Sequence, residues 1–71
     1  MEKFKLRGEF IKLDALLKVV GVAPSGGMAK LLIADELVSV NGELETRRGK
    51  KIRSGDIVEV GLDGAPRIEV E

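Results

Sequence analysis

The apolar residues near the start of the chain recur with the period of an α-helix. They are spaced at i, i+3, i+4 and i+7 and comprise Leu13, Leu16, Leu17 and Val20. This spacing predicts a helix that begins at Lys12 or Leu13 and ends at Val20. Asp14 suits the positive end of its dipole and Lys18 the negative end, while Gly21 can adopt the left-handed conformation that terminates many helices.

A second helical pattern begins after Pro24. Ser25 is a favourable N-cap, and the apolar positions that follow define one face of a helix extending to Asp35 or Glu36. This face comprises Met28, Ala29, Leu32, Ile33 and Leu37. Two short consecutive helices predict an αα-hairpin.

Beyond Leu37 the apolar period changes to that of a β-strand. Val38 and Val40 alternate with a polar residue, and Asn41-Gly42 is the dipeptide that best tolerates the positive φ angles of a type I′ turn. The sequence therefore predicts a β-hairpin.

The register of this hairpin leaves one choice open. With a two-residue turn, Glu43 pairs with Val40 and Leu44 with Ser39, so Leu44 faces away from the two valines. Either a β-bulge intervenes, or Leu44 covers the other face of the sheet.

Further segments alternate as strands do. Turn residues precede apolar segments 57–60 and 67–70, and a short N-terminal strand around Phe4 can pair at the sheet edge. A strand beginning at Lys51 would point Ile52 inward and leave Lys51 and Arg53 exposed. The fold class predicted is α+β, with the two-helix hairpin packed on a small, mostly antiparallel twisted sheet. The residues expected to be largely buried are Leu16, Leu17, Leu32, Val40, Ile57 and Val60.

Composition limits both the organisation and the chemistry of the chain. Its 71 residues are expected to form one small domain, residues 1–71, with an aliphatic core that includes its only aromatic residues, Phe4 and Phe10. Cysteine, histidine and tyrosine are absent, so we expect no disulfide, metal site, cofactor or enzymatic activity. The carboxylate pairs Asp35-Glu36 and Glu43-Glu45 are interpreted as exposed charge. No apolar run is long enough to span a bilayer and no signal segment is recognisable, so a cytoplasmic location is expected.

Charge is distributed unevenly along the chain. Twelve Lys and Arg balance twelve Asp and Glu, yet residues 36–45 carry only acidic charge and residues 46–52 only basic charge. Five cations occur within residues 47–53. Such a concentration favours binding of a polyanion, because each neutralised phosphate releases counterions. The alternative is an ordinary solvated hairpin loop.

The order of helices and strands resembles the S-four RNA-binding domain, also called the alpha-L RNA-binding motif. The resemblance lies in five segments spread over residues 12–60, namely Lys12-Leu13-Asp14-Ala15-Leu16-Leu17-Lys18, Ala23-Pro24-Ser25 with Ala29-Lys30, Val38-Ser39-Val40-Asn41-Gly42, Gly49-Lys50-Lys51-Ile52, and Ser54-Gly55-Asp56-Ile57-Val58-Glu59-Val60. The ends beyond these segments are short. The chain therefore looks like one of the small stand-alone bacterial members, the YbcJ- or YaaA-like group.

The resemblance implies that the two helices and the basic region form one RNA-facing surface. The candidate RNA-binding residues are Lys12, Ser25, Lys30, Arg47, Arg48, Lys50, Lys51 and Arg53. Arginines can bind phosphate oxygens bidentately or lie on base planes, whereas lysines act as point charges. Three other cations, Arg7, Lys18 and Arg67, are interpreted as solvated surface.

Two positions depart from the family pattern. Lys12 stands where family members often have Arg, and Gly26 stands where Arg often follows the serine of the second helix. At the start of that helix the N–H groups of Gly26 and Gly27 can bind an anion, with Lys30 in support. Alternatively, Ser25 only caps the helix and the glycines only permit a tight turn.

The resemblance implies a structured RNA, of the ribosomal or transfer RNA class. Scarcity of aromatic residues also disfavours a reader of single strands, which usually stacks bases on aromatic rings. Our interpretation is a non-catalytic, monomeric RNA-binding protein, with the ribosomal particle as a candidate partner. The alternative is a ribosome-associated protein-interaction module that docks through its polarised charge.

Overall fold

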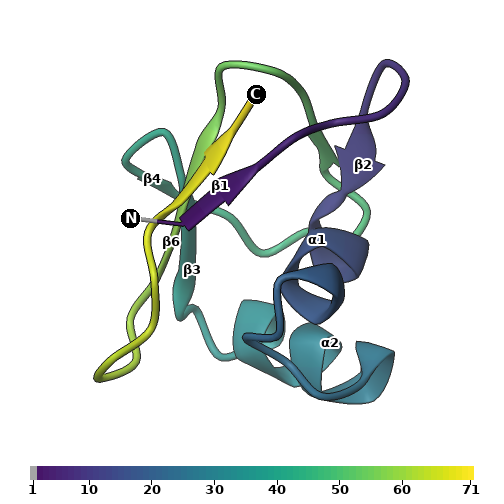
Figure 1. The fold of residues 1–71 in the computed structure, drawn as a ribbon. Helices are drawn as coiled ribbons and strands as arrows, with labels where there is room; N and C mark the ends of the chain where they lie inside the picture. Colours follow the sequence, from purple (N-terminus) through teal and green to yellow (C-terminus); the bar gives the residue numbers. More distant parts are fainter. Residues whose placement is uncertain (1) are drawn as a thin grey trace.

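The computed structural model describes residues 2–71 and has the predicted α+β architecture (Figure 1). Two helices accompany a five-stranded sheet and a separate two-stranded ribbon. The helices are α1 (Leu13–Val19) and α2 (Gly26–Ala34), and the strands are β1 (Glu2–Phe4), β2 (Ile11–Lys12), β3 (Val38–Val40), β4 (Glu43–Leu44), β5 (Lys51–Ile52), β6 (Ile57–Val60) and β7 (Ile68–Val70). Neither helix of the described chain is long and apolar enough to cross a bilayer.

Both helices lie where the apolar spacing predicts them. Gly21 follows α1 with φ of 83°, and the Ser25 side chain caps α2 by accepting a hydrogen bond of 3.2 Å from the Met28 N–H. The expected apolar face of α2 is wrong at Met28, which is 42% exposed. The buried stripe consists of Ala29, Leu32 and Ile33, and Met28 lies at its edge in the first turn.

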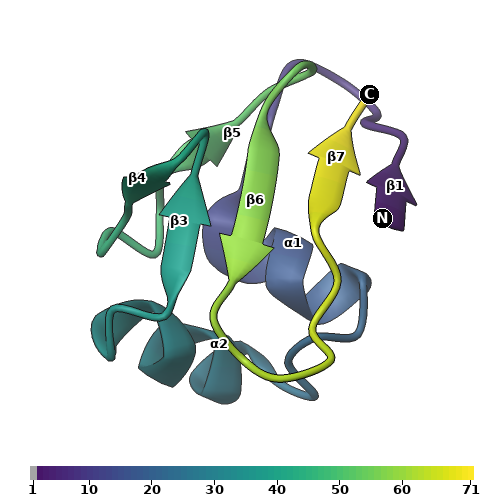
Figure 2. The same ribbon diagram turned by 90° about the vertical axis from the view of Figure 1, so that its left-hand side faces the viewer.

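The main sheet has the strand order β1-β7-β6-β3-β4 (Figure 2). Its neighbours are antiparallel except for β1 and β7, which pair in parallel at the edge where the N-terminal strand was expected. In the register of β3 with β6, Val38 lies opposite Val60 and Val40 opposite Val58. These four valines face the helices and, with Ile68 and Val70 of β7, form the sheet half of the core.

The β3–β4 hairpin has the predicted two-residue turn. Asn41 and Gly42 have φ angles of 52° and 83°, as a type I′ turn requires. Val40 pairs with Glu43 and Ser39 with Leu44, so no bulge shifts the register of these pairs. Leu44 lies on the face opposite the valines and is 52% exposed.

The expected core is confirmed for Leu16, Leu17, Leu32, Val40 and Val60 and is wrong at Ile57. Ile57 is only partly buried because successive side chains of a strand point to opposite faces. Val58 and Val60 take the inward positions of β6, so Ile57 falls on the other face. Phe4 is half-buried against the core as expected, whereas Phe10 is 37% exposed and does not belong to it.

Candidate nucleic-acid interface

The basic residues are organised by the ribbon of β2 and β5, a pairing that the sequence did not predict. Ile11 lies opposite Ile52 and Lys12 opposite Lys51 in antiparallel register. Ile52 is fully buried, as predicted, and Ile11 packs against the core. Because successive side chains of a strand point to opposite faces, the other face of the ribbon carries Phe10, Lys12, Lys51 and Arg53. We call this face the ribbon face.

The loop of residues 47–50, which we call the basic loop, closes the amino end of α1. The Leu13 N–H donates to the Lys50 carbonyl at 2.9 Å, and the Asp14 N–H donates to the Arg48 carbonyl at 3.2 Å. Lys12 at the N-cap position supplies no side-chain bond, so these loop carbonyls satisfy two of the free N–H groups of the helix. This bonding fixes the basic loop beside the ribbon face.

Two cations of the basic loop are already paired with carboxylates. Arg47 binds Glu45 through two guanidinium nitrogens at 3.0 and 3.2 Å, and Arg48 lies 3.4 Å from Asp14. The hydrogen bonds from Arg47 hold the pKa of Glu45 below its ordinary value. Within the ribbon face and the basic loop, Lys12, Lys50, Lys51 and Arg53 form no such ion pair with any residue of 2–71, and we call these four the unpaired cations.

The basic loop and the ribbon face together line a hollow of about 500 Å³. Its walls are Arg47, Gly49, Lys50, Lys51 and Arg53. Cations converge on this hollow from two elements, and no carboxylate lines it. The space therefore suits an anionic group such as a phosphate.

The end of the ribbon is held by a polar bracket from the β3–β4 turn. The Asn41 amide donates to Asp56 at 2.9 Å and accepts from the Ile57 N–H at 2.9 Å. The other Asp56 oxygen accepts from the Arg53 N–H at 2.8 Å. Asn41, predicted primarily as a turn former with contact to a base or phosphate as the lesser alternative, thus also fixes the backbone that carries Arg53.

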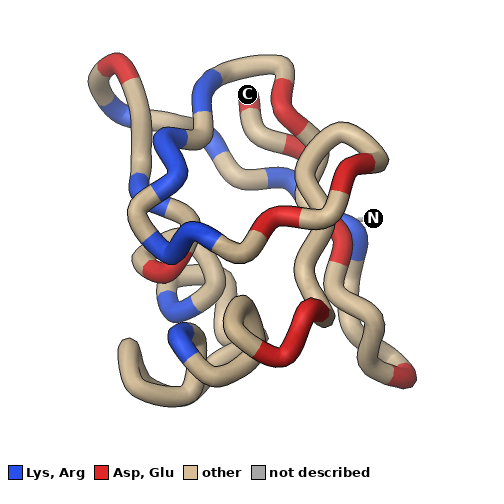
Figure 3. The backbone as a smooth tube through the Cα atoms, turned by 180° about the vertical axis from the view of Figure 1, so that it is seen from behind, with Lys and Arg blue, Asp and Glu red and all other residues tan. Residues whose placement is uncertain are grey.

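Charge is segregated across the whole molecule. Viewed from behind in Figure 3, most basic segments follow the side of the helices and the ribbon, and most acidic segments follow the sheet. The polarised surface that the alternating charge runs predicted is therefore present in three dimensions.

Comparison with known proteins identifies the family. Residues 4–70 match the model of the S4 domain. The chain belongs to the S4 domain family. This match confirms the resemblance seen in the sequence and extends it beyond residues 12–60.

Curated relatives agree with this assignment. The chain is 46% identical over 52 residues, 73% of each chain, to "Probable ribosome maturation protein RlbA" of Bacillus subtilis (strain 168). It is 44% identical over 48 residues, 68% of this chain and 69% of the relative, to "Putative RNA-binding protein YbcJ" of Escherichia coli (strain K12). In both cases the similarity covers more than two thirds of each chain.

The structure brings six of the eight candidate residues into direct proximity and places two apart. Lys12, Arg47, Arg48, Lys50, Lys51 and Arg53 belong to the ribbon face and the basic loop. Ser25 and Lys30 are exposed on α2, which follows the carboxyl end of α1, the end away from the basic loop. Neither Ser25 nor Lys30 lines the hollow between the basic loop and the ribbon face.

The start of α2 retains its two interpretations. The Ser25 hydroxyl accepts from the Met28 N–H, and Gly26 and Gly27 form the first residues of the helix. A β-carbon on Gly26 would meet no atom within 4 Å, so the space beside it is open. Capping by Ser25 is confirmed, and anion binding at this S4 position stays a prediction.

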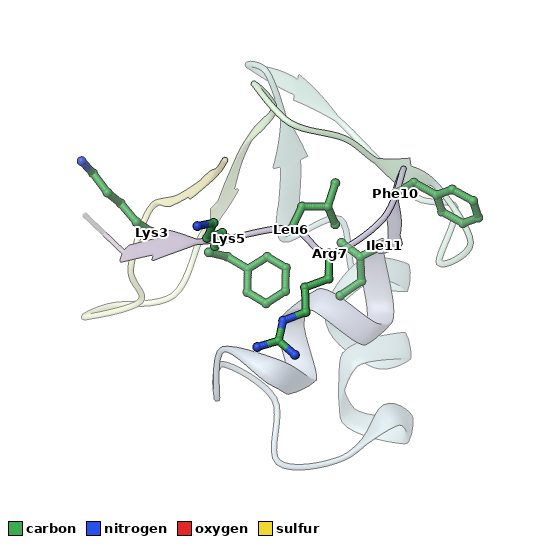
Figure 4. Close-up of a pocket in the computed structure, with 7 residues that line it drawn as sticks. Lys3, Lys5, Leu6, Arg7, Phe10 and Ile11 are labelled. Carbon is green, nitrogen blue, oxygen red and sulfur yellow. The ribbon is translucent and has the colours of Figure 1, made fainter.

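A second hollow lies beside the N-terminal segment (Figure 4). It measures about 460 Å³ and is lined by residues 3–7 with Phe10 and Ile11. The side chains of Lys3 and Arg7 diverge in Figure 4, so these two cations do not converge on one ligand. Within the described chain, no three carboxylates gather in a way that could hold a metal ion.

Sequence reasoning missed Phe10 as a candidate. Figure 4 shows its ring directed away from Leu6 and Ile11, which pack against the core. The signal was present in the alternation of Phe10, Ile11 and Lys12, which places Phe10 on the side of the cation. Strand β2 has only two residues, which is too short for alternation alone to predict a strand.

Proposed function

We propose that this S4 protein binds structured RNA, of the ribosomal or transfer RNA class, through the ribbon face, the basic loop and the start of α2. The observation that carries the proposal is the gathering of the unpaired cations on one surface of a chain with zero net charge. Membership of the S4 domain family and the printed names of the two relatives support RNA as the polyanion.

The chemistry of the surface suits the phosphate backbone of a folded RNA. Lys12, Lys50 and Lys51 offer compact charges whose positions are set by strand pairing and by the bonds to α1. Neutralising phosphates there releases counterions, which gives affinity without reading sequence. A folded RNA presents its phosphates at fixed spacing, and a rigid set of cations can match that spacing.

Arg47 and Arg48 have a conditional role in this proposal. Each is held by a carboxylate in the free protein, and each is largely exposed, at 72% and 59% of its side chain. Binding of a phosphate requires the arginine to exchange or share its carboxylate. The guanidinium fork fits phosphate and carboxylate equally, so this exchange costs little geometric change.

The proposed role is non-catalytic. The chain would act as a single-domain monomer in the cytoplasm, with the ribosomal particle as a candidate partner. Its contribution would be to hold or shape an RNA segment.

Binding can be tested with three purified RNAs of equal length. They are a folded ribosomal RNA fragment, a transfer RNA and an unstructured oligonucleotide, each titrated with the protein over a salt series. The expected result is preference for the folded RNAs and affinity that falls as salt rises. Absence of RNA binding, with a protein partner that persists after nuclease treatment of a cell extract, would favour the protein-interaction alternative.

A further inference from the structure

The ribbon face contains an exposed aromatic ring among cations. Phe10 is 37% exposed, and its ring has the Lys51 Nζ at 4.9 Å and the Arg53 Cζ at 5.9 Å from its centroid. The chain has two phenylalanines, and Phe10 is the one that lies outside the core. Phe4 packs against the core.

The position of the ring follows from the register of the ribbon. Ile11 pairs with Ile52 and Lys12 with Lys51, so the next pair in the same register is Phe10 with Arg53. Cations therefore reach the ring from directly across and diagonally, and both contacts fall within the range of cation–π attraction. The ring is held at the surface by the ribbon, and both cations have exposed side chains that can move.

The same face contains a like-charged pair. Lys12 and Lys51 are directly opposite each other, both are exposed, and neither has an ion pair among residues 2–71. Like charges at facing positions of a ribbon repel, and an anion placed between them removes the repulsion. The ribbon face thus offers an aromatic surface beside a position that favours an anion.

We propose that Phe10 stacks an unpaired base of the bound RNA, while Lys12 and Lys51 hold the phosphates that flank this nucleotide. A base has an extended π-face and an adjoining phosphate, which is the combination that the ribbon face presents. Arg53, opposite Phe10, can lie on the free side of the base as a second stacking plane. The proposal rests on the proposed function and specifies a bulged or looped-out nucleotide within an otherwise folded RNA.

The affinity test uses three stem-loop RNAs that differ at one stem position. The first has a bulged adenosine, the second an abasic nucleotide at the same bulge, and the third no bulge. One base stacked on an aromatic side chain predicts affinity for the adenosine RNA roughly 5- to 150-fold above that for the abasic RNA. Phe10→Leu should remove this difference between the adenosine and abasic RNAs, and Phe10→Tyr should retain it.

A spectroscopic test does not depend on the stability of Phe10→Leu. The chain has no Trp and no Tyr, so Phe10→Trp introduces a single tryptophan at the ribbon face. Its emission should be quenched by the adenosine RNA and much less by the abasic RNA. Leu62→Trp is the matched control, because Leu62 is exposed to a similar degree, 43%, in the β6–β7 loop away from the ribbon (Figure 1).

The outcomes separate this inference from the proposed function. Equal affinity of the wild type for all three RNAs, with equal quenching of the two tryptophan variants, would overturn base stacking and leave RNA binding intact. Binding to none of the RNAs would overturn the proposed function and this inference with it. Discrimination for adenosine that disappears only in Phe10→Leu would establish the stacking role.

Discussion

Glu45 holds Arg47 in the free protein and thereby limits what Arg47 can offer to an anion. The lowered pKa of Glu45, caused chiefly by the hydrogen bonds from Arg47, means that the carboxylate stays charged at neutral pH. A depressed carboxyl pKa adds stability above the pKa of the unfolded chain, and this contribution is lost as pH falls through the folded value. Acid conditions therefore both weaken the pair and release Arg47.

Glu45→Gln should release Arg47 at neutral pH. The expected result is tighter binding of folded RNA. The slope of log affinity against log salt should also become more negative by about 0.7–0.9 for each added phosphate contact. The measurement is affinity over a salt series. Glu59→Gln is the matched control, since Glu59 is an exposed carboxylate on β6 with no recorded ion pair in the described chain. If both variants behave alike, Arg47 is not the responsible group.

Gly42 illustrates a backbone requirement that is independent of RNA. Its φ is 83°, and a β-carbon there would meet no atom within 4 Å, so only the conformation restricts the residue. Gly42→Val should lower the free energy of unfolding by about 1–2 kcal/mol more than Gly42→Asn, because Asn tolerates the left-handed region. Urea unfolding of both variants checks this. Equal stabilities would show that the turn adapts without strain.

Helices and strands whose apolar residues recur with a clear period could be predicted from the sequence. The pairing of the two-residue strands β2 and β5 could not. Both helices and the β3–β4 hairpin follow from apolar spacing, caps and turn residues, which are local properties of the chain. The ribbon of β2 and β5 depends on pairing between residues about forty positions apart, and each strand has two residues. No local pattern encodes such a contact, and the alternation of Phe10, Ile11 and Lys12 was too short to indicate by itself that Phe10 is exposed.

Helix α1 links the interface to the core, and Leu17 is its clearest test. Leu17 is fully buried, so Leu17→Ala should lower the free energy of unfolding by roughly 2–5 kcal/mol through lost burial and a residual cavity. Val19, 62% exposed on the same helix, provides the control, and Val19→Ala should change stability by about 0.5 kcal/mol or less. Similar thermal melts of the two variants would contradict the assigned helix faces.

At the scale of the whole molecule, segregation of charge could be predicted but its pairing could not. The runs 36–45 and 46–52 are opposite in charge along the sequence, and in Figure 3 most basic segments and most acidic segments lie on different sides of the fold. Which cations are neutralised depends on tertiary contacts. Arg48 contacts Asp14 because the basic loop caps α1. Neither the sequence of the basic loop nor that of α1 predicts this contact by itself.

The central claim is that one basic surface binds structured RNA, and matched charge removal tests it most directly. One variant combines Lys50→Gln, Lys51→Gln and Arg53→Gln, and the other combines Arg7→Gln, Lys18→Gln and Arg67→Gln. Each removes three positive charges, so the two variants have the same net charge, and all six positions are exposed except Lys50, which is half-buried. Thermal melts of both variants check that each remains folded.

The measurement is the slope of log affinity against log salt for a folded RNA. For a wild type that contacts about four phosphates, a slope near −3 is expected. The variant at residues 50, 51 and 53 should bind weakly with a slope shallower by about two, whereas the variant at residues 7, 18 and 67 should stay close to the wild type. Equal losses of affinity and slope in the two variants would contradict the claim, because binding would then follow total charge and not this surface.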